Sequence, residues 1–318
     1  MGISEYIMHG PSEGISEETD EANSAVKIVG GNVFVELDPD HPGFKDEGYR
    51  SRRNEIAKIA LEWNEMSMEE RRAKKIPHAP YSEDEDAVWA AIMERITPVH
   101  EKYACKQYRE NAKKLGLPND RIPQLQEVSE TLEEMTGFRQ EPVGGLVHPK
   151  TFHTALANRV FLSTQYIRHS SRPFYTPEPD VVHELVGHTA MLGVPEWAEL
   201  NVLFGEADMR TESEAAIIRL GSVYWYVLEF GACREDGNVK SVGPGLLSSF
   251  GEMEHACASG EVEYRKPNFE EMETLPYDVT KYQPILYIWD SFEEMYEKTK
   301  EFVTNWGTDK DPRKDLHK

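Results

Sequence analysis

Apolar residues recur at helical spacing through most of the chain from about residue 30 onward. The helices that this spacing predicts cover residues 49–63, 83–108, a stretch through Leu132 and Met135, 152–168 and 213–230. Segments rich in Gly, Pro and turn residues separate them, and short strands are expected near 140–147, 239–243 and 261–266. No repeat or low-complexity linker divides residues 31–318, so we expect one mainly α-helical domain.

The first 30 residues differ from the rest in composition. Residues 1–26 contain no Lys or Arg, and their acids are Glu5, Glu13, Glu17, Glu18, Asp20 and Glu21. Such a segment buries too little apolar surface to fold by itself, so we expect residues 1–30 to be a flexible acidic tail. It lacks the basic start and apolar middle of a secretory signal, and the arginines of an organelle transit peptide.

Composition and charge narrow the class of function. The 318-residue chain carries a formal net charge of −22 at pH 7 and is 39% hydrophobic. The negative charge repels nucleic-acid phosphates, and no apolar run approaches the ~20 residues of a membrane span. The cysteines Cys105, Cys233 and Cys257 have no metal-finger or redox spacing, which favours reduced thiols. We therefore expect a cytoplasmic protein that binds neither nucleic acid nor membrane.

Two histidines stand five residues apart in the run from Thr176 to His188. Thr176 suits an N-cap and Pro177 the first helical position, so a helix is expected to start there. On a regular helix His183 and His188 would lie ~140° apart, unlike the histidines of a zinc-protease motif. Both can bind one ion only near the helix end or where the helix distorts, which Gly187 would favour. Alternatively, both are ordinary histidines hydrogen-bonded at a helix end.

A candidate third ligand is Glu229, in the last turn of the helix predicted at 213–230. The helix dipole disfavours a carboxylate there by about 0.3–1 kcal/mol, and its sequence neighbours are aromatic and apolar. Glu229 is therefore either exposed to solvent or held by a cation. Two histidines and a carboxylate are the ligand set of non-haem Fe(II) oxygenases, which keep coordination positions open for chemistry.

Several segments resemble the pterin-dependent aromatic amino acid hydroxylases, in that family's order. They are Asp38–Phe44, Gln165–His188, Tyr224–Gly231, Gly245–Glu252 and Tyr282–Pro284. The resemblance covers roughly residues 35–305 and implies a single catalytic domain, a basket of helices with short β-ribbons. It also implies that His183, His188 and Glu229 bind Fe(2+). Since neither the family's regulatory domain nor its oligomerising helix is recognisable, a monomer is expected.

The resemblance also implies roles for residues around the iron. The cofactor is expected to be tetrahydrobiopterin or a related pterin or folate, bound by Gly145, Leu146, Val147, Phe152 and Glu184. The residues that match the family's catalytic centre are Glu184, Tyr224 and Ser248. The positions that match substrate-binding residues are Arg168, Thr176, Trp225, Phe230, Ser248, Tyr277 and Val279. Arg168 suits a carboxylate, which guanidinium binds in a bidentate manner. By residue type alone, each could be an ordinary turn, core or surface residue.

Substrate preference depends on a few positions. Trp225 stands where tryptophan hydroxylases usually have a smaller aromatic residue, and Val279 where tyrosine hydroxylases carry an acid. Both favour phenylalanine, although Leu162 replaces a histidine of animal phenylalanine enzymes. His148 and Pro149 stand where animal members carry small hydroxylated residues, which leaves the identity of the pterin open. The expected reaction is hydroxylation of L-phenylalanine to L-tyrosine, a step of phenylalanine catabolism or tyrosine biosynthesis.

Other functions remain open on the sequence. Hydroxylation of tryptophan, or of phenylalanine at the meta position, would use the same cofactors and differ only in its product. A hydrolase would be active without O2 or a reductant. A helical interaction module that merely keeps the motif would bind no stoichiometric iron, so metal analysis separates it from the enzymes.

Overall fold

Helices make up most of the chain that this computed structural model describes, which is residues 26–29, 32–35, 42–174, 179–279 and 281–311. The α-helices are α2 (Pro42–Lys45), α3 (Glu47–Asn64), α4 (Met68–Arg72), α5 (Glu83–Tyr103), α6 (Lys106–Leu115), α7 (Leu125–Thr136), α8 (Pro149–Ala157), α9 (Ala190–Leu192), α10 (Pro195–Met209), α11 (Glu214–Tyr224), α12 (Pro244–Leu247), α13 (Phe250–Ala258), α14 (Phe269–Met272) and α15 (Phe292–Asn305). Two segments are π-helices: η1 (His183–Thr189) and η2 (Trp225–Glu229). None of the described helices is both long and apolar enough to cross a membrane.

Three small sheets accompany the helices. Their strands are β1 (Val26–Val29), β2 (Asn32–Val35), β3 (Arg139–Val143), β4 (Leu146–Val147), β5 (Val160–Thr164), β6 (Ala232–Glu235), β7 (Asn238–Ser241), β8 (Glu263–Arg265) and β9 (Ile285–Trp289). β1, β2 and β4 form an antiparallel sheet, while β3 and β5 form a parallel pair joined by a crossover that includes α8. The third sheet has the order β7-β6-β9-β8, in which only β6 and β7 are antiparallel.

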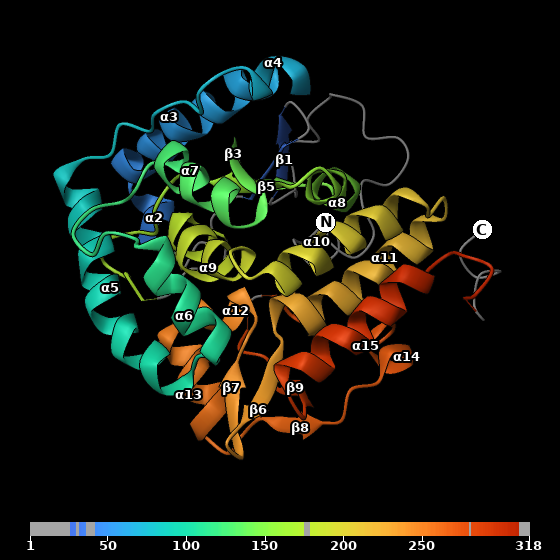
Figure 1. The fold of residues 1–318 in the computed structure, drawn as a ribbon. Helices are drawn as coiled ribbons and strands as arrows, with labels where there is room; N and C mark the ends of the chain where they lie inside the picture. Colours follow the sequence, from blue (N-terminus) through green and yellow to red (C-terminus); the bar gives the residue numbers. More distant parts are fainter. Residues whose placement is uncertain (1–25, 30–31, 36–41, 175–178, 280, 312–318) are drawn as a thin grey trace.

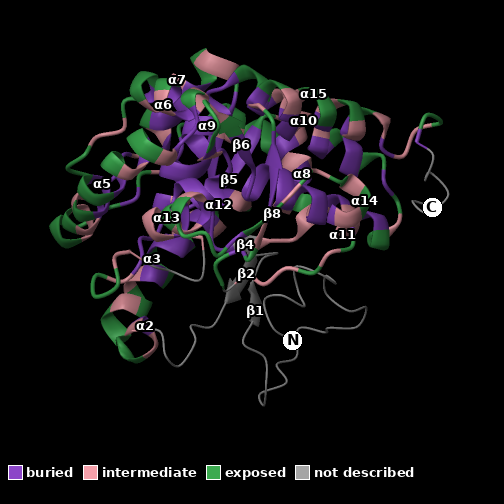
Figure 2. Ribbon diagram, turned by 90° about the horizontal axis from the view of Figure 1, so that it is seen from below, coloured by how far each residue is buried: buried purple, intermediate pink, exposed green. Residues whose placement is uncertain are grey.

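The helices surround the centre of the molecule (Figure 1). α3, α5 and α6 follow one rim, α10, α11 and α15 lie on the other side, and the four-stranded sheet closes the lower edge of the view. In the perpendicular view, buried residues fill the middle while exposed ones lie along the outer helices (Figure 2). The mainly α-helical single domain expected from the sequence is therefore confirmed.

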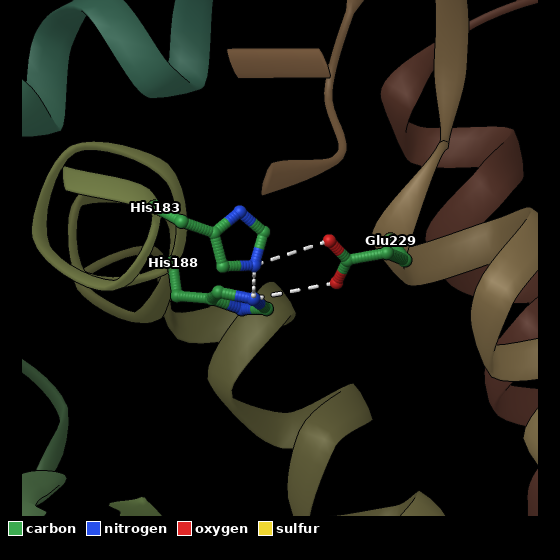
Figure 3. A group of neighbouring side chains, drawn as sticks. All are labelled: His183, His188 and Glu229. Carbon is green, nitrogen blue, oxygen red and sulfur yellow. Dashed lines mark hydrogen bonds and ion pairs between the residues drawn. The ribbon is translucent and has the colours of Figure 1, made fainter. Parts of the chain in front are cut away.

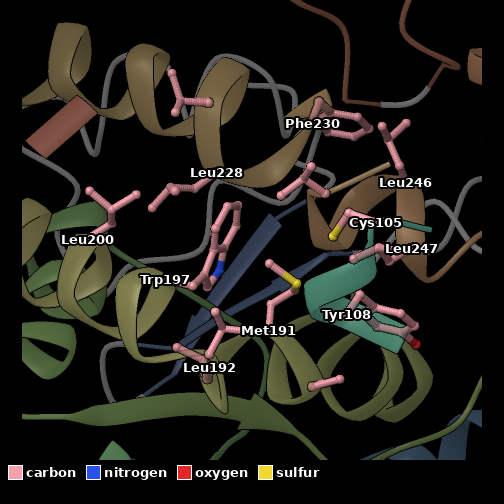
Figure 4. Packing of buried hydrophobic residues seen from close by; sticks show 14 of the residues in the cluster. Cys105, Tyr108, Met191, Leu192, Trp197, Leu200, Leu228, Phe230, Leu246 and Leu247 are labelled. Carbon is pink, nitrogen blue, oxygen red and sulfur yellow. The ribbon is translucent and has the colours of Figure 1, made fainter. Parts of the chain in front are cut away.

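One large hydrophobic core packs against the backs of both π-helices. Its largest fully buried side chains include Trp89, Trp197 and Trp289. Trp197 lies between Leu228 of η2 and Met191 of α9 (Figure 4). Each buried side chain of this size contributes roughly 1.5–3 kcal/mol of hydrophobic stabilisation. The core thereby holds the segments that carry the candidate metal ligands.

The predicted helix at 152–168 is wrong in its second half. α8 ends at Ala157, Arg159 adopts a left-handed backbone with φ 56°, and Val160–Thr164 forms β5. All five residues of β5 are buried, and β-branched and aromatic side chains there favour a strand that pairs with β3. A fully buried strand shows no alternation, which explains why its apolar spacing resembled a helix.

Two other boundaries also differ from the expectation. The single helix predicted at 83–108 is divided into α5 and α6, because Ala104 and Cys105 take extended backbone angles. β1 lies inside the segment 1–30, for which the sequence predicts a flexible tail. The rest of that segment, residues 1–25, lies outside the described residues.

Candidate metal centre

The two histidines face one another because their helix is a π-helix. A π-helix closes hydrogen bonds between residues five apart, so such residues stack on one face as residues four apart do in an α-helix. His183 and His188 are the first and sixth residues of η1. The helix distortion that a shared ion would require is therefore present.

The helix that contains η1 starts later than predicted. Helical backbone begins at Val181, whereas Pro179 and Asp180 are not helical, so the start predicted at Thr176 is wrong. Asp180 takes the capping role, since its Oδ1 accepts the backbone N–H of His183 at 3.1 Å. A capping carboxylate satisfies an N–H that has no partner within the helix. Asp180 therefore fixes the backbone of the first candidate ligand.

Glu229 is the last residue of η2, which continues directly from α11. The prediction that it ends a long helix is confirmed, although the final turn is π rather than α. The next residue, Phe230, leaves the helical region with φ −118° and ψ 28°. The side chain of Glu229 is almost fully buried, so it is not exposed to solvent. The remaining possibility is a carboxylate held by a cation.

The three side chains converge on one point (Figure 3). Nε2 of His183 lies 3.4 Å from Oε1 of Glu229, and Nε2 of His188 lies 3.3 Å from Oε2. The two Nε2 atoms are 3.0 Å apart. All three ligand atoms lie within 4.8 Å of one another, and no other such group of three occurs among the described residues. Two imidazoles and one carboxylate that converge in this way match the ligand set of the Fe(II) facial triad.

Burial prepares these groups for a cation. It lowers the pKa of His183 to about 4, so the imidazole is neutral at pH 7. Burial would raise the pKa of the Glu229 carboxyl, but the neighbouring His188 and His183 outweigh this effect and lower it. A metal binds neutral imidazole and ionised carboxylate, so His183 and Glu229 are in their binding forms at pH 7.

Contacts behind the ligands hold their orientation. Oγ of Ser248 lies 2.9 Å from Nδ1 of His183, which leaves Nε2 free to bind the metal. α12 approaches both ligand helices closely: a Cβ on Gly187 would lie 2.9 Å from the carbonyl oxygen of Pro244. A Cβ on Gly243 would lie 2.2 Å from the carbonyl oxygen of Glu229. Gly187, considered above as a site of distortion, thus also permits close packing.

A cavity of about 330 Å³ opens onto the three ligands. Most of the residues that the sequence analysis selected line it: Gly145, Val147, Phe152, Arg168, His183, Glu184, His188, Tyr224, Trp225, Glu229, Phe230, Ser248, Tyr277 and Val279. Leu146 lies in β4 between Gly145 and Val147. Thr176 lies outside the described residues.

The residues expected to bind the pterin lie on one side of this cavity. Oε1 of Glu184 accepts hydrogen bonds from the backbone N–H and the hydroxyl of Thr164, at 3.1 and 3.0 Å. No described residue gives Oε2 a hydrogen bond, and burial raises the pKa of the Glu184 carboxyl to about 7. Phe152 presents an aromatic ring 5.8 Å from that of Tyr224, whose hydroxyl donates to Asn201 at 3.0 Å. An aromatic wall and a carboxyl are thus available to a flat, hydrogen-bonding ring.

The residues expected to bind the amino acid form another part of the cavity wall. Trp225 stacks on Tyr277 with ring centroids 4.3 Å apart, and Phe230 lies 4.5 Å from the Trp225 ring. The guanidinium of Arg168 binds Asp180 through Nε and Nη2, at 2.8 and 2.7 Å. Within the described part of the chain, its Nη1 has no hydrogen-bond partner. An aromatic slot and an available guanidinium N–H suit an aromatic amino acid and its carboxylate.

Several residues of the same wall are not among the site residues predicted from the sequence. Among them, Glu252 is buried, accepts the backbone N–H of Gln283 at 3.0 Å, and has a pKa raised by burial to about 8. It lies four residues after Ser248 and is the last residue of the segment Gly245–Glu252 that resembles the hydroxylases, so the resemblance could have indicated it. His153, which follows Phe152, also lines the cavity and pairs with Asp208 of α10, 55 residues away. Nothing local in the sequence indicates that pair.

Comparison with known proteins agrees with this geometry. The model of the biopterin-dependent aromatic amino acid hydroxylases matches residues 16–310. The chain belongs to this family. Curated relatives among these hydroxylases include the human phenylalanine-4-hydroxylase, 39% identical over 273 residues, or 85% of this chain and 58% of the relative. The tyrosine 3-monooxygenase of Schistosoma mansoni is 38% identical over 277 residues, or 86% of this chain and 57% of the relative. The chain thus spans less than two thirds of these relatives.

Solved hydroxylase structures share the fold. Phenylalanine hydroxylase from Chromobacterium violaceum, with bound iron(III) and 7,8-dihydrobiopterin, aligns with a TM-score of 0.67 at 27% identity, covering 70% of this chain and 82% of that one. The apo form of the cold-active phenylalanine hydroxylase from Colwellia psychrerythraea 34H aligns with a TM-score of 0.68 at 28% identity. The alignment covers 72% of this chain and 88% of that one. The catalytic-domain fold of the hydroxylases, which the resemblance implied, is therefore confirmed.

Proposed function

We propose that this chain hydroxylates L-phenylalanine to L-tyrosine with O2, Fe(II) and a tetrahydropterin. One observation carries the proposal: a single cavity is lined by the His183, His188 and Glu229 triad, by Phe152 with Glu184, and by the slot beside Arg168. Each of these parts suits one reactant, and their common cavity would bring the reactants together.

Iron suits the donor set of the triad. His183, His188 and Glu229 would hold it, and the cavity opens onto all three. Ser248 would keep Nδ1 of His183 protonated and its Nε2 directed at the metal. When bound, ferrous iron and a reduced pterin supply the activation of O2, one atom of which enters the ring while the other is reduced with two electrons from the pterin. The protein contributes position, exclusion of water and hydrogen bonds.

The pterin would occupy the wall formed by Phe152 and Glu184. Phe152 offers an aromatic face, and Oε2 of Glu184 is available because both hydrogen bonds from Thr164 go to Oε1. With a pKa near 7, the Glu184 carboxyl can hold or release a proton close to neutral pH. Gly145 and Val147 line the adjacent part of the cavity, where backbone groups would meet the ring.

The amino acid would enter the slot with its carboxylate toward Arg168. The ion pair with Asp180 keeps the guanidinium in place and leaves Nη1 for the substrate. Trp225, Phe230 and Tyr277 would enclose the ring. Val279 lines the same cavity without a charge or a hydrogen-bonding group, which favours the unsubstituted ring of phenylalanine over tyrosine.

Aerobic turnover tests the proposal. The Fe(II)-loaded protein with tetrahydrobiopterin and phenylalanine should form tyrosine, measured by chromatography. Glu229→Ala should abolish both tyrosine formation and stoichiometric iron. Glu254→Ala, which removes an exposed acid of α13, is the matched control and should leave both unchanged. Absence of tyrosine from the parent protein, or a Glu229→Ala variant that is as active as the parent, would contradict the proposal.

A second candidate function is hydroxylation of another aromatic amino acid. Relatives that are tyrosine 3-monooxygenases match this chain about as well as the phenylalanine enzymes do. Equal concentrations of phenylalanine, tyrosine and tryptophan should be offered separately, and the products identified. We expect kcat/KM for phenylalanine to be at least ~10-fold higher than for the other two, the selectivity typical of a pocket that differs by one group. We further propose a cytoplasmic monomer, which light scattering and cell fractionation would check.

A further inference from the structure

A buried histidine and aspartate form a polar pair in the wall of the cavity. His153 lies on α8 and Asp208 on α10, and Nδ1 of His153 is 3.2 Å from Oδ1 of Asp208. His153 is 3% exposed and Asp208 is fully buried. Neither residue contacts the three metal ligands through a hydrogen bond or ion pair recorded for the described chain. The pair therefore has no place in the chemistry derived above.

The surroundings of the pair are otherwise apolar. The His153 ring lies 5.9 Å from the ring of Phe152 and 5.6 Å from that of Tyr224. Ile217 and Ile218 of α11 line the same cavity. Burying a carboxylate and an imidazole among such groups costs free energy, and apolar side chains of similar volume would pack equally well. The pair is therefore costly at this position unless its remaining hydrogen-bonding groups find partners.

The pair has unused hydrogen-bonding capacity. Oδ2 of Asp208 is buried without a hydrogen-bond partner among the described residues. Within the same part of the chain, nothing bonds to Nε2 of His153, while the residue lines the cavity. In the Nδ1–H tautomer, which donates to Asp208, Nε2 of His153 is an acceptor. A buried acceptor that opens on a cavity suits a hydroxyl group of a bound molecule.

We propose that His153, oriented by Asp208, is a subsite for a hydroxyl group on the side chain of the reduced pterin. The inference rests on the proposed function, which places the pterin ring against Phe152. The His153 ring lies 5.9 Å from that of Phe152 and both line the cavity, so His153 adjoins the pterin rather than the amino acid, whose expected contacts are Arg168 and Trp225. Pterins share their ring and differ in the substituent at C6, which is dihydroxypropyl in biopterin and methyl in the simplest synthetic analogue. A single acceptor beside that substituent would distinguish them.

Equilibrium binding tests the subsite without relying on turnover. Calorimetry under anaerobic conditions should measure the dissociation constants of tetrahydrobiopterin and 6-methyltetrahydropterin for the Fe(II)-loaded protein. In the parent, tetrahydrobiopterin should bind about 5- to 10-fold more tightly, the effect of one hydrogen bond. His153→Leu should bring the ratio of the two constants close to 1, by weakening tetrahydrobiopterin alone. Asp208→Asn, which disturbs the tautomer, should reduce the ratio in part.

Matched variants separate recognition from packing. Glu206→Gln changes an exposed acid of α10 two residues before Asp208 and should keep the parental ratio. His153→Gln, which retains an acceptor, should recover part of the preference for tetrahydrobiopterin if His153→Leu folds poorly. Equal affinities of the parent for both pterins, or an equal loss for both in His153→Leu, would overturn the subsite. Failure of the parent to hydroxylate phenylalanine with either pterin would instead contradict the proposed function.

Discussion

Replacing Gly243 by alanine would place a methyl group against the backbone that carries Glu229. The added Cβ would lie 2.2 Å from the carbonyl oxygen of Glu229, 2.5 Å from its carbonyl carbon and 2.6 Å from the backbone nitrogen of Gly231. Unstrained contacts between such atoms begin at about 3.5 Å, so one of the two segments must move by roughly 1 Å. All three opposing atoms belong to backbone, which cannot rotate away as the end of a side chain does. The displacement therefore reaches the metal ligand itself.

The size of this displacement sets the expected loss. A metal site tolerates changes of about 0.2 Å in its ligand distances, so a shift of roughly 1 Å should weaken Fe(II) binding by at least ~10- to 100-fold. Overpacking should also lower the free energy of unfolding by about 1–3 kcal/mol. Competition with a chelator would measure the Fe(II) affinity, and thermal unfolding followed by circular dichroism would measure stability.

Gly221→Ala is the matched control for this experiment. Gly221 lies in α11, the helix that continues into η2, and a Cβ there meets nothing within 4 Å. Alanine in a helix is favoured over glycine by about 0.5–1 kcal/mol, so this variant should be at least as stable as the parent and bind iron equally well. If a folded Gly243→Ala variant bound Fe(II) as tightly as the parent and Gly221→Ala do, the close approach of α12 would not position Glu229.

Three further predictions concern single side chains. Ser248→Ala should remove the hydrogen bond to Nδ1 of His183 and lower the Fe(II) affinity by about 10- to 100-fold, measured with a chelator, with little change in folding. Asp180→Ala should lower the free energy of unfolding by about 3–5 kcal/mol in urea titration, because Arg168 would lose its buried partner; a loss below 1 kcal/mol would refute this. Burial raises the pKa of Glu252 to about 8. The folded protein therefore keeps a proton that the unfolded chain releases above about pH 4.5. As a result, Glu252 lowers the free energy of unfolding increasingly from about pH 5 to 8. The melting temperature of Glu252→Gln relative to the parent should therefore rise over that range, and a constant difference would contradict the reasoning.

The metal ligands could be predicted because their chemistry is unusual where it occurs. A carboxylate at the end of an apolar helix needs a partner, and Glu229 stood out for that reason. For His183 and His188, the sequence indicates only that their helix must distort if both are to bind one ion. The π-turn that meets it depends on tertiary packing against α12, since residue types near η1 do not indicate where an extra residue is inserted.

The remaining differences share a physical cause, which is that long-range contacts decided the local structure. β5 is a strand because β3 provides its hydrogen bonds, although the apolar spacing of Val160–Thr164 also suits a helix. Asp180 caps the helix in place of Thr176 because its carboxylate is also held by Arg168, which precedes it by 12 residues. The pair of His153 and Asp208 joins two helices and was likewise invisible to any local pattern.

The two π-helices make the number of residues as important to the metal centre as their identity. Deleting one residue from the interior of η1 would leave a segment that can continue as an ordinary α-helix and keep its hydrogen bonds. The deletion would place the two histidines four residues apart, a spacing that an α-helix also keeps on one face. Without a deletion, an ordinary α-helix would turn His188 ~140° away from His183. The five-residue spacing of His183 and His188 therefore serves one metal ion only while η1 keeps its π-turn. A variant in which η1 relaxed to an ordinary α-helix would lose the centre with all three ligands still present in its sequence.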